Sequence, residues 1–388
     1  MKIIYVSTVL PQTTYDKLYS SSRILPSPAA QKYHSLVIKG LESNNIEINT
    51  VSLVPETSES DKNFYKVRES SEGNIKYHYI GSSCSSVFHG MILFIKAYRK
   101  ILKLSADKGS VIICDALLTS MSAAAILVSK LFRRKAVAVV TDLPFMLDKT
   151  KSIRTRLTNC IIPYFSGYIL MTEAMNNICN PKYKPYMIME GLVDSSFLTV
   201  NNEKFENTQK KICIYAGGLH EKYGIGKLVE AFILTDIKDS ELHIYGNGNY
   251  QDKLQKICTE HSNIKYMGVQ PNKTVVEDEL SASLLINPRP SDEDFTKYSF
   301  PSKNMEYMVS GTPVLTTKLP GMPEDYYPFV CTFDDESVEG MNNALQKVLN
   351  TPAEELREKG RSAQQFVLEN KNNIIQTRKI MEYVKNLK

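Results

Sequence analysis

The sequence contains no long hydrophobic run. Its 388 residues are 43% hydrophobic and 23% charged, which are ordinary proportions for a soluble globular protein. The longest apolar stretches, residues 91–95 and 121–128, end at Lys96 and Lys130, whereas a membrane-spanning helix needs about 18 or more apolar residues. The amino terminus is too short and, beyond Val6, too polar for a signal peptide. We therefore expect a cytoplasmic protein whose chain begins with a buried strand.

Cysteine motifs are also missing. The seven cysteines are scattered without Cys-x-x-Cys spacing, and their odd number argues against a complete disulfide framework. This pattern favours a reducing cytoplasm. Cys114 and Cys213 lie inside apolar strand patterns and are interpreted as core residues. We predict neither a zinc site nor a catalytic thiol, and no metal.

The length exceeds what one hydrophobic core usually serves, so we expect two domains. Strand patterns alternate with helical patterns twice along the chain, which predicts an α/β fold with parallel sheets covered by helices on both faces. The predicted strands are residues 2–6, 47–53, 76–79, 111–114, 136–140, 167–171 and 186–189, then 211–215, 241–248 and 264–270 with their glycine turns, 284–286 and 314–315. The last stretch, residues 353–388, is helical in pattern.

The segment after the first strand lacks glycine. Residues 7–27 contain none, and we predict a long polar loop there that is mobile without ligand. The first helix is predicted to begin after Ser27, a capping residue, with Pro28 at its first position. Asn44 and Asn45 suit its end.

Basic residues gather in the first half. Residues 1–194 hold 24 Lys and Arg against 15 Asp and Glu, and the remainder holds 23 against 27. Clusters lie at 96–108, 130–135 and 149–156. The first follows the apolar residues 91–95, a pattern typical either of a helix on an anionic membrane or of a surface helix with a solvated basic face. No base-reading module accompanies this charge, so nucleic-acid binding is not expected.

The stretch from Ser283 to Tyr326 carries the most information. An apolar strand, a polar loop over residues 287–299, a helix opened by Pro301 and a second strand follow one another. Ligands of α/β sheets bind outside the carboxyl ends of strands, and free amides at a helix N-terminus suit phosphates. Ser302, Lys303 and the backbone around Phe300 and Pro301 are candidates for that contact.

This stretch resembles the donor site of family 4 glycosyltransferases, which have the GT-B fold and a Glu-x7-Glu motif. The resemblance implies that Glu306 is the second glutamate, which binds the ribose hydroxyls of a UDP- or GDP-sugar; by itself Glu306 would be a solvated helix residue. Tyr298 stands where the first glutamate, which contacts the transferred sugar, is usual. Either Tyr298 or one of Asp292, Glu293 and Asp294 takes that role, or sugar recognition differs.

The sequence Phe300-Pro301-Ser302-Lys303 is similar to that found in the branch of this family that assembles bacterial surface polysaccharides, such as capsule or O-antigen. Its members retain the anomeric configuration of the sugar, and their main task is to stabilise charge on the leaving diphosphate. The expected substrates are a nucleotide-sugar donor and a polysaccharide or lipid-linked acceptor. No cofactor is expected beyond the donor itself.

Glycine turns supply further candidate contacts. Gly217 and Gly218 follow the strand at 211–215 and let backbone amides approach a ligand. By resemblance to the family, Lys222 meets the donor diphosphate, with Lys227 and Arg289 as substitutes. The family reads the nucleobase through backbone groups, which implies a role for Gly268 and Val269. His220 is as readily a solvated turn histidine as a ligand contact.

In the first half, Asp115 and Asp142 each follow an apolar strand. Carboxylates at strand ends point toward a ligand crevice, so one interpretation is that either residue orients the acceptor hydroxyl. Capping of the following helix accounts equally well for an aspartate at each position.

The resemblance implies GT-B architecture, with two Rossmann-like domains whose parallel sheets face a central cleft. We expect an acceptor domain at 1–198, joined by the last helix at about 372–388, and a nucleotide-sugar domain at 199–371. The leading hypothesis is a retaining hexosyltransferase. The alternatives are a nucleotide-sugar epimerase of the same fold, or a catalytically silent partner protein, which Tyr298 and the glycine-free first loop keep open.

Overall fold

The structure is a computed structural model that describes residues 1–21, 27–54, 69–81, 88–147, 152–199, 210–235 and 237–387. The chain forms two compact units. Unit 1 comprises Met1–Leu192 with Asn373–Lys388, and unit 2 comprises Val193–Asn372. The polar linker predicted at 201–206 and residues 149–151 of the third basic cluster lie outside the described residues.

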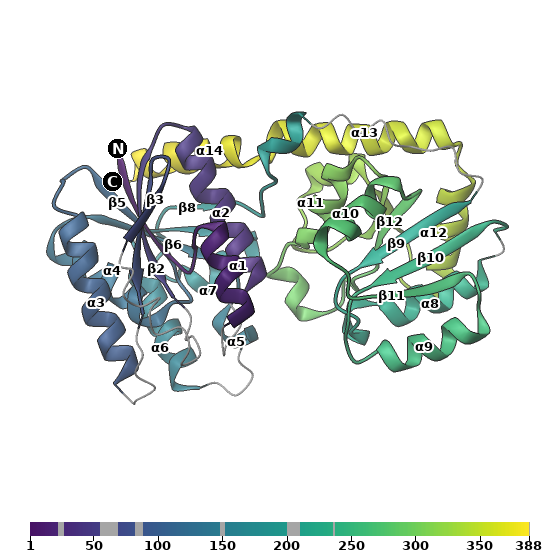
Figure 1. The fold of residues 1–388 in the computed structure, drawn as a ribbon, viewed down its shortest axis with the longest axis horizontal. Helices are drawn as coiled ribbons and strands as arrows, with labels where there is room; N and C mark the ends of the chain where they lie inside the picture. The colour runs from purple at the N-terminus through teal and green to yellow at the C-terminus, as the bar shows by residue number, and fades with distance from the viewer. Residues whose placement is uncertain are drawn as a thin grey trace. The chain divides into compact units, whose positions relative to one another are not determined.

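Unit 1 is built on an eight-stranded sheet of order β3-β4-β2-β1-β5-β6-β7-β8 (Figure 1). Neighbouring strands are parallel except β3 and β4, which are antiparallel. The strands are β1 Lys2–Ser7, β2 Glu47–Leu53, β3 Glu69–Glu72, β4 Ile75–Ile80, β5 Ser110–Asp115, β6 Lys135–Val140, β7 Gly167–Leu170 and β8 Tyr186–Ile188. The strands predicted for the first half are therefore confirmed, and β3 was not foreseen.

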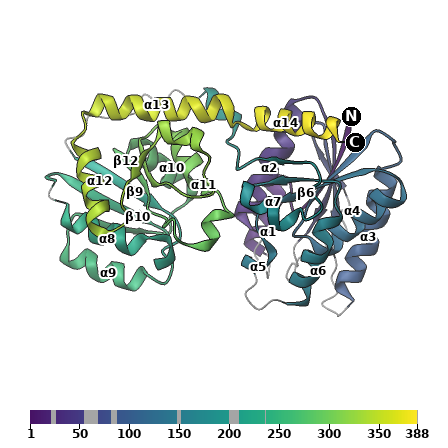
Figure 2. The same cartoon turned by 180° about the vertical axis from the view of Figure 1, so that it is seen from behind.

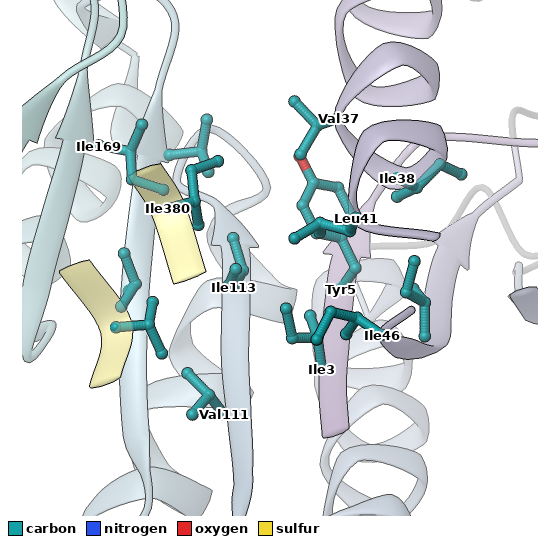
Figure 3. Packing of buried hydrophobic residues seen from close by; sticks show 14 of the residues in the cluster. Ile3, Tyr5, Val37, Ile38, Leu41, Ile46, Val111, Ile113, Ile169 and Ile380 are labelled. Atoms are coloured by element: carbon teal, nitrogen blue, oxygen red, sulfur yellow. The ribbon is translucent and has the colours of Figure 1, made fainter. Parts of the chain in front are cut away.

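Helices cover both faces of this sheet. They are α1 Gln12–Ser21, α2 Pro28–Ser43, α3 His89–Leu104, α4 Thr119–Leu131, α5 Pro144–Leu147, α6 Ile153–Ile161, α7 Glu173–Cys179 and α14 Asn373–Asn386, with a short 3-10 turn at Ile162–Tyr164. The Ser27 side chain accepts the Ala30 N–H and Pro28 begins α2, so the predicted cap is confirmed. Figure 3 shows Ile380 of the last helix packing beside Ile113 and Ile169 in the sheet core.

Unit 2 has a six-stranded, all-parallel sheet of order β11-β10-β9-β12-β13-β14 (Figure 2). Its strands are β9 Lys211–Ala216, β10 Ser240–Tyr245, β11 Ile264–Gly268, β12 Leu284–Asn287, β13 Val314–Thr317 and β14 Cys331–Phe333. Its helices are α8 Ile225–Leu234, α9 Gln251–Glu260, α10 Asn272–Ser281, α11 Ser302–Ser310, α12 Val338–Asn350 and α13 Ala353–Asn370. The 3-10 turns are Ser195–Thr199, Glu221–Tyr223, Asp294–Lys297 and Glu324–Phe329.

Two separate apolar cores hold the layers of unit 2 together. One packs α8 and α12 on a face of the sheet, around Phe232, Leu242 and Leu345. The other packs α11 and α13 on the opposite face, around Tyr307, Met308 and Val367. Strands buried on both faces by helices give the near-continuous apolar runs seen in the sequence.

Two sequence expectations need correction. The long polar loop expected at residues 7–27 contains the helix α1, whose Leu18 packs with Leu10 in a small buried cluster. The carboxyl-terminal stretch is helical as predicted, in two helices separated by Lys371 and Asn372, and the last helix begins at Asn373, close to the expected 372. The boundary expected after residue 198 lies after Leu192, because Val193 donates its N–H to Lys371 O and packs in the core of unit 2.

None of the helices in the described ranges is both long and apolar enough to cross a bilayer. The six described cysteines carry free thiols, and burial raises the pKa of the Cys179 thiol to about 12. Burial also raises the pKa of Cys114 above its ordinary value. Such thiols are poor nucleophiles because the thiolate is the reactive form.

Candidate functional site

The topology of unit 2 marks where a ligand binds. The chain runs outward from β9 through β10 and β11 on one side, and through β12, β13 and β14 on the other. The strand order therefore reverses between β9 and β12, and crevices for ligands in open α/β sheets form at such a point, outside the carboxyl ends of the strands. The loops that leave β9 and β12 carry Gly217 to Tyr223 and Pro288 to Pro301, which include most of the predicted donor contacts.

The turn after β9 is shaped by close backbone approaches. The Gly217 N–H donates to Tyr245 O at 3.1 Å, so that amide is already used. Within the described residues the Gly218 N–H has no acceptor, and its carbonyl accepts the Tyr215 hydroxyl at 2.8 Å. Gly224 has φ of +80°, and a Cβ there would lie 2.0 Å from Pro288 O. Only glycine therefore allows this turn to touch the loop after β12.

This contact places Lys222 and Arg289 around one aromatic pair. The rings of Tyr223 and Phe295 meet edge to face with centroids 6.0 Å apart. The Lys222 Nζ lies 5.0 Å from the Tyr223 centroid and 5.7 Å from that of Phe295. The Arg289 Cζ lies 5.2 Å and 5.5 Å from the same two centroids. The sequence offered these cations as alternatives, and the structure brings both to one place.

Neither cation is neutralised by a carboxylate within the described residues, and Arg289 Nε is buried there without a hydrogen-bond acceptor. Burial lowers the pKa of Arg289 below its ordinary value, and the nearby Tyr223 partly opposes that shift. A guanidinium nevertheless remains charged in proteins. Two cations that lie against one aromatic pair and have unused donors can bind an anion.

Buried hydrogen bonds fix α11 over the strand ends. Asn287, the last residue of β12, donates from Nδ2 to Asn304 Oδ1 at 2.6 Å, and Asn304 Nδ2 donates to Thr316 Oγ1 of β13 at 3.1 Å. The Ala216 N–H at the end of β9 donates to the Tyr307 hydroxyl at 2.9 Å. These buried groups were not predicted as site residues, although an asparagine ending an apolar strand is the signal that marks Asn287.

The first turn of α11 has backbone N–H groups without protein acceptors. Within the described residues, the N–H groups of Ser302 and Lys303 meet no protein acceptor, as is usual at a helix N-terminus. Pro301, the capping residue, has no side-chain acceptor for them. Phe300 is buried against Tyr326, with ring centroids 5.1 Å apart. Its side chain therefore belongs to the core, which leaves the backbone as its means of contact.

Lys303 and Glu306 form an ion pair. The Lys303 Nζ lies 2.8 Å from Glu306 Oε2, one helical turn along α11. Desolvation opposes the charge of Lys303, but the Glu306 and Glu279 carboxylates outweigh it and raise the pKa of Lys303. Both side chains of the pair are partly exposed, so they remain accessible to a polar ligand.

The candidates for the first-glutamate role differ in their surroundings. Tyr298 is half-buried, and its N–H donates to Phe295 O at 3.1 Å. Asp294 is exposed and pairs with Lys297 at 3.3 Å, and Glu293 accepts the Thr296 hydroxyl at its carbonyl. Asp292 is exposed. Of these, Tyr298 lies nearest in sequence to α11.

The remaining donor candidates are spread along the same sheet edge. Gly268 ends β11 with φ of +72° and accepts the Gly246 N–H at 2.9 Å, and Val269 after it is exposed. Lys227 donates to Glu336 O at 3.2 Å. His220 is exposed and contacts Asn249 Oδ1 through Nδ1 at 3.2 Å.

In unit 1, Asp115 and Asp142 end β5 and follow β6. Asp115 is buried, accepts the Leu117 N–H at 3.0 Å and lies 3.4 Å from His34 Nε2. Asp142 still reaches solvent, yet desolvation by the surrounding chain, and then the Asp115 charge, raise its pKa to about 6. Asp115 therefore lies beneath the surface and Asp142 at it. Among the described residues no group of three His, Cys, Asp or Glu side chains is arranged to hold a metal.

Residues 198–365 match the sequence model of a family described as "Glycosyl transferases group 1". The matched segment covers most of unit 2. It contains the loops after β9 and β12, the whole of α11 and both cations, Lys222 and Arg289. No curated protein sequence matches the chain.

Solved structures show the fold of the whole chain. Sucrose-phosphate synthase from Thermosynechococcus elongatus is 13% identical, with a TM-score of 0.66 over 99% of each chain. HepE from Anabaena, in complex with UDP, is 12% identical, with a TM-score of 0.68 over 100% of each chain. The lipopolysaccharide outer core galactosyltransferase WaaB is 14% identical, with a TM-score of 0.63 over 99% of each chain. The chain has the GT-B fold, as the resemblance implied.

Proposed function

We propose that this protein is a retaining glycosyltransferase that moves a sugar from a UDP- or GDP-sugar to a polysaccharide or lipid-linked oligosaccharide. The group 1 domain and the GT-B fold support transfer of a sugar. Structures of HepE hold UDP in one case and UDP-glucose in another, which favours a uridine nucleotide as the first donor to test here.

The observation that carries the proposal is the placement of Lys222 and Arg289. Both lie against the Tyr223–Phe295 pair, and neither has a carboxylate partner within the described residues. A donor diphosphate supplies the missing anion. The free amides at the start of α11 provide a second set of donors from the same sheet edge.

Each part of the donor then has a partner. The nucleobase contacts the backbone at Gly268 and Val269. Glu306 accepts from the two ribose hydroxyls, because a carboxylate has two acceptor oxygens. Lys222, Arg289 and the Ser302 and Lys303 amides bind the diphosphate, and Gly218 offers a further amide. Tyr298 is assigned the contact with the transferred sugar. Its hydroxyl can both donate and accept.

Charge stabilisation on the leaving group is the main catalytic contribution. The bond from the sugar C1 to the diphosphate oxygen breaks, and the electron pair stays on the diphosphate. The acceptor oxygen forms the new bond to C1 on the same face, and its proton passes to the departing diphosphate oxygen. Preorganised cations and amides lower the barrier because they are already aimed at the oxygens where negative charge grows.

On the acceptor side, we assign Asp142 the contact with the attacking hydroxyl and Asp115 the support beneath it. A pKa of about 6 leaves Asp142 ionised at neutral pH, so it can accept a hydrogen bond from the hydroxyl. The proposed products are bacterial surface polysaccharides of the capsule or O-antigen kind. The proposed location is the cytoplasm, with peripheral contact to the inner face of the membrane.

Isothermal titration calorimetry with UDP, GDP and CMP tests the donor site. We expect one nucleotide diphosphate to bind, and both Glu306→Ala and Arg289→Met to weaken it about 10- to 100-fold, the worth of one or two charge-assisted hydrogen bonds. Titration with uridine or guanosine, which lack phosphates, distinguishes the two variants. We expect Glu306→Ala to weaken binding of the nucleoside and Arg289→Met to leave it unchanged. Lys256→Met, on the far exposed helix α9, is the control.

Tyr298 in place of the first glutamate favours a second candidate, a silent partner that binds nucleotide without transferring sugar. Incubation with the sugar form of the tightest nucleotide decides between the two. Release of the free nucleoside diphosphate, or formation of a labelled glycan, supports the transferase. Binding of the nucleotide-sugar without either product supports the silent partner.

A further inference from the structure

Helix α3 exposes apolar side chains along its first two turns. Its buried face is formed by Leu93, Ala97 and Ile101. The outward stripe begins with Phe88, Met91 and Ile95, which are 61%, 55% and 40% exposed. Surface helices of globular proteins normally present polar residues there. The stripe continues with the exposed cations Arg99 and Lys103 at the same spacing.

Helix α6 repeats this arrangement. Ile153 and Leu157, one turn apart, are 78% and 52% exposed. The buried residues of α6 are Thr155 and Thr158, and the Thr158 hydroxyl lies 2.6 Å from that of Thr119 in α4. Small polar residues therefore hold α6 in place, while its large apolar residues face outward. The fold makes little use of these two side chains.

A groove lies between α3 and α6. It encloses about 400 Å³ between the N-terminal turns of α3, α4 and α6. Its lining combines Leu93 of α3, Leu118 and Met121 at the start of α4, and Ile153 and Leu157 of α6, with Arg154 among them. Figure 1 shows the three helices gathered on one side of unit 1. Ile153 and Leu157 thus line the groove, and the exposed apolar residues of α3 lie on the side of that neighbouring helix away from its buried face. Exposed apolar surface on neighbouring helices marks an interaction site.

The charge of this face selects the partner. Helices α3 to α6 together hold seven Lys and Arg and no Asp or Glu. Lys100 pairs with Glu69, and Lys96 donates to Gly81 O. The exposed Arg99, Lys103, Arg154 and Arg156 have no carboxylate partner within the described residues. A second copy of this face would meet it with like charge, which disfavours a symmetric dimer.

We propose that the α3–α6 face, defined by Phe88, Met91, Ile95, Ile153 and Leu157 with the cations Arg99, Lys103, Arg154 and Arg156, docks on an anionic phospholipid bilayer. The apolar side chains enter the headgroup region and the cations contact lipid phosphates. The proposal deepens the proposed function and rests on it for its purpose, which is to bring the enzyme to a lipid-linked acceptor. The binding itself needs no donor.

Vesicle co-sedimentation of the full chain tests this face. One vesicle type contains equal parts of phosphatidylcholine and phosphatidylglycerol, and the other contains phosphatidylcholine alone. We expect binding to the anionic vesicles that weakens as salt rises, because screening shortens the reach of the charges. Ile153→Ser with Leu157→Ser, and separately Arg154→Glu with Arg156→Glu, should each lower the bound fraction about tenfold, the weaker anchoring expected from lost apolar area or reversed charge.

The matched control is Lys256→Glu with Lys347→Glu, on exposed helix positions of unit 2, which should bind vesicles nearly as wild type does. Calorimetry with UDP on every variant measures nucleotide binding by unit 2 independently of vesicle binding. A protein that binds vesicles but no nucleotide would therefore contradict the proposed function and leave the membrane proposal standing. Equal binding to both vesicle types overturns the membrane proposal. It is also overturned if the α6 variants bind as wild type, or if they instead abolish a dimer seen by light scattering.

Discussion

The Nζ of Lys303 lies 2.8 Å from Oε2 of Glu306 on α11. Lys303, assigned near the donor phosphates, and Glu306, assigned to the ribose, are therefore coupled through an ion pair. Lys303 holds one carboxylate oxygen of Glu306 in place before nucleotide arrives. A preorganised carboxylate loses less conformational freedom when it binds a diol.

This pair predicts that Lys303→Met weakens nucleotide binding although Glu306 is intact. The variant keeps the length of the side chain and removes the charge, so Glu306 loses the partner that orients it, and the donor site loses one positive charge. We expect the Kd for UDP or GDP to rise about 10-fold or more, measured by calorimetry. Lys273→Met removes a similar but exposed partner, that of Glu277, and should change little. Wild-type affinity in Lys303→Met would contradict the coupling.

Asn304 is predicted to stabilise unit 2 rather than to touch the ligand. Asn304→Ala leaves the buried Asn287 amide without its acceptor and Thr316 without its donor. An unsatisfied buried polar group costs about 1–3 kcal/mol, and the free energy of unfolding should fall by roughly that amount. Urea unfolding followed by circular dichroism measures it. Asn343→Ala, at an exposed position of α12, is the control. Equal free energies of unfolding for the two variants would contradict the prediction.

Gly224→Ala is expected to damage both the fold and the anion site. Its new Cβ would lie 2.0 Å from Pro288 O, so the turn bearing Lys222 must move away from the loop bearing Arg289. Gly268 has a similar φ of +72° but no neighbour within 4 Å of an added Cβ. Gly268→Ala therefore costs only the left-handed strain of about 1–2 kcal/mol. A larger fall in melting temperature and in UDP affinity for Gly224→Ala than for Gly268→Ala is the expected outcome.

Asp142 predicts a pH dependence of stability. Its pKa is about 6 in the folded chain against an ordinary 3.8, so the folded state binds the proton more tightly and stability falls as pH rises from about 4 to 6. Asp142→Asn removes this loss and should raise the melting temperature at pH 7.5 while leaving it unchanged at pH 4. Because the side chain reaches solvent, screening keeps the gain below about 1 kcal/mol.

Differential scanning calorimetry at the two pH values measures the effect, with Asp107→Asn, an exposed aspartate of the same unit, as the control. An equal change at both pH values would show that the substitution acts through packing and not through titration.

Much of the fold follows from local pattern. The alternation of apolar strands and helices predicted every strand of the sheets except β3 and β14. The strand β3 has the polar sequence Glu-Ser-Ser-Glu, and β14 is only three residues long. The helix α1 was missed because Gln12 to Ser21 has few apolar residues, and its packing through Leu18 is a tertiary contact. Local propensity is a weak signal in such a segment, and tertiary packing decides it.

The sequence by itself determined the order of the elements, the glycine turns, the start of α11 and the presence of Glu306, because each depends on residues close in the chain. Even the Lys303–Glu306 pair follows from helical spacing. Tertiary structure alone decided that Lys222 and Arg289 share the Tyr223–Phe295 pair, that Asn287 and Tyr307 fix α11, and that α3 and α6 expose neighbouring apolar surfaces. Those relationships join segments far apart in sequence, and only the packing of the sheets and helices sets the distances between them.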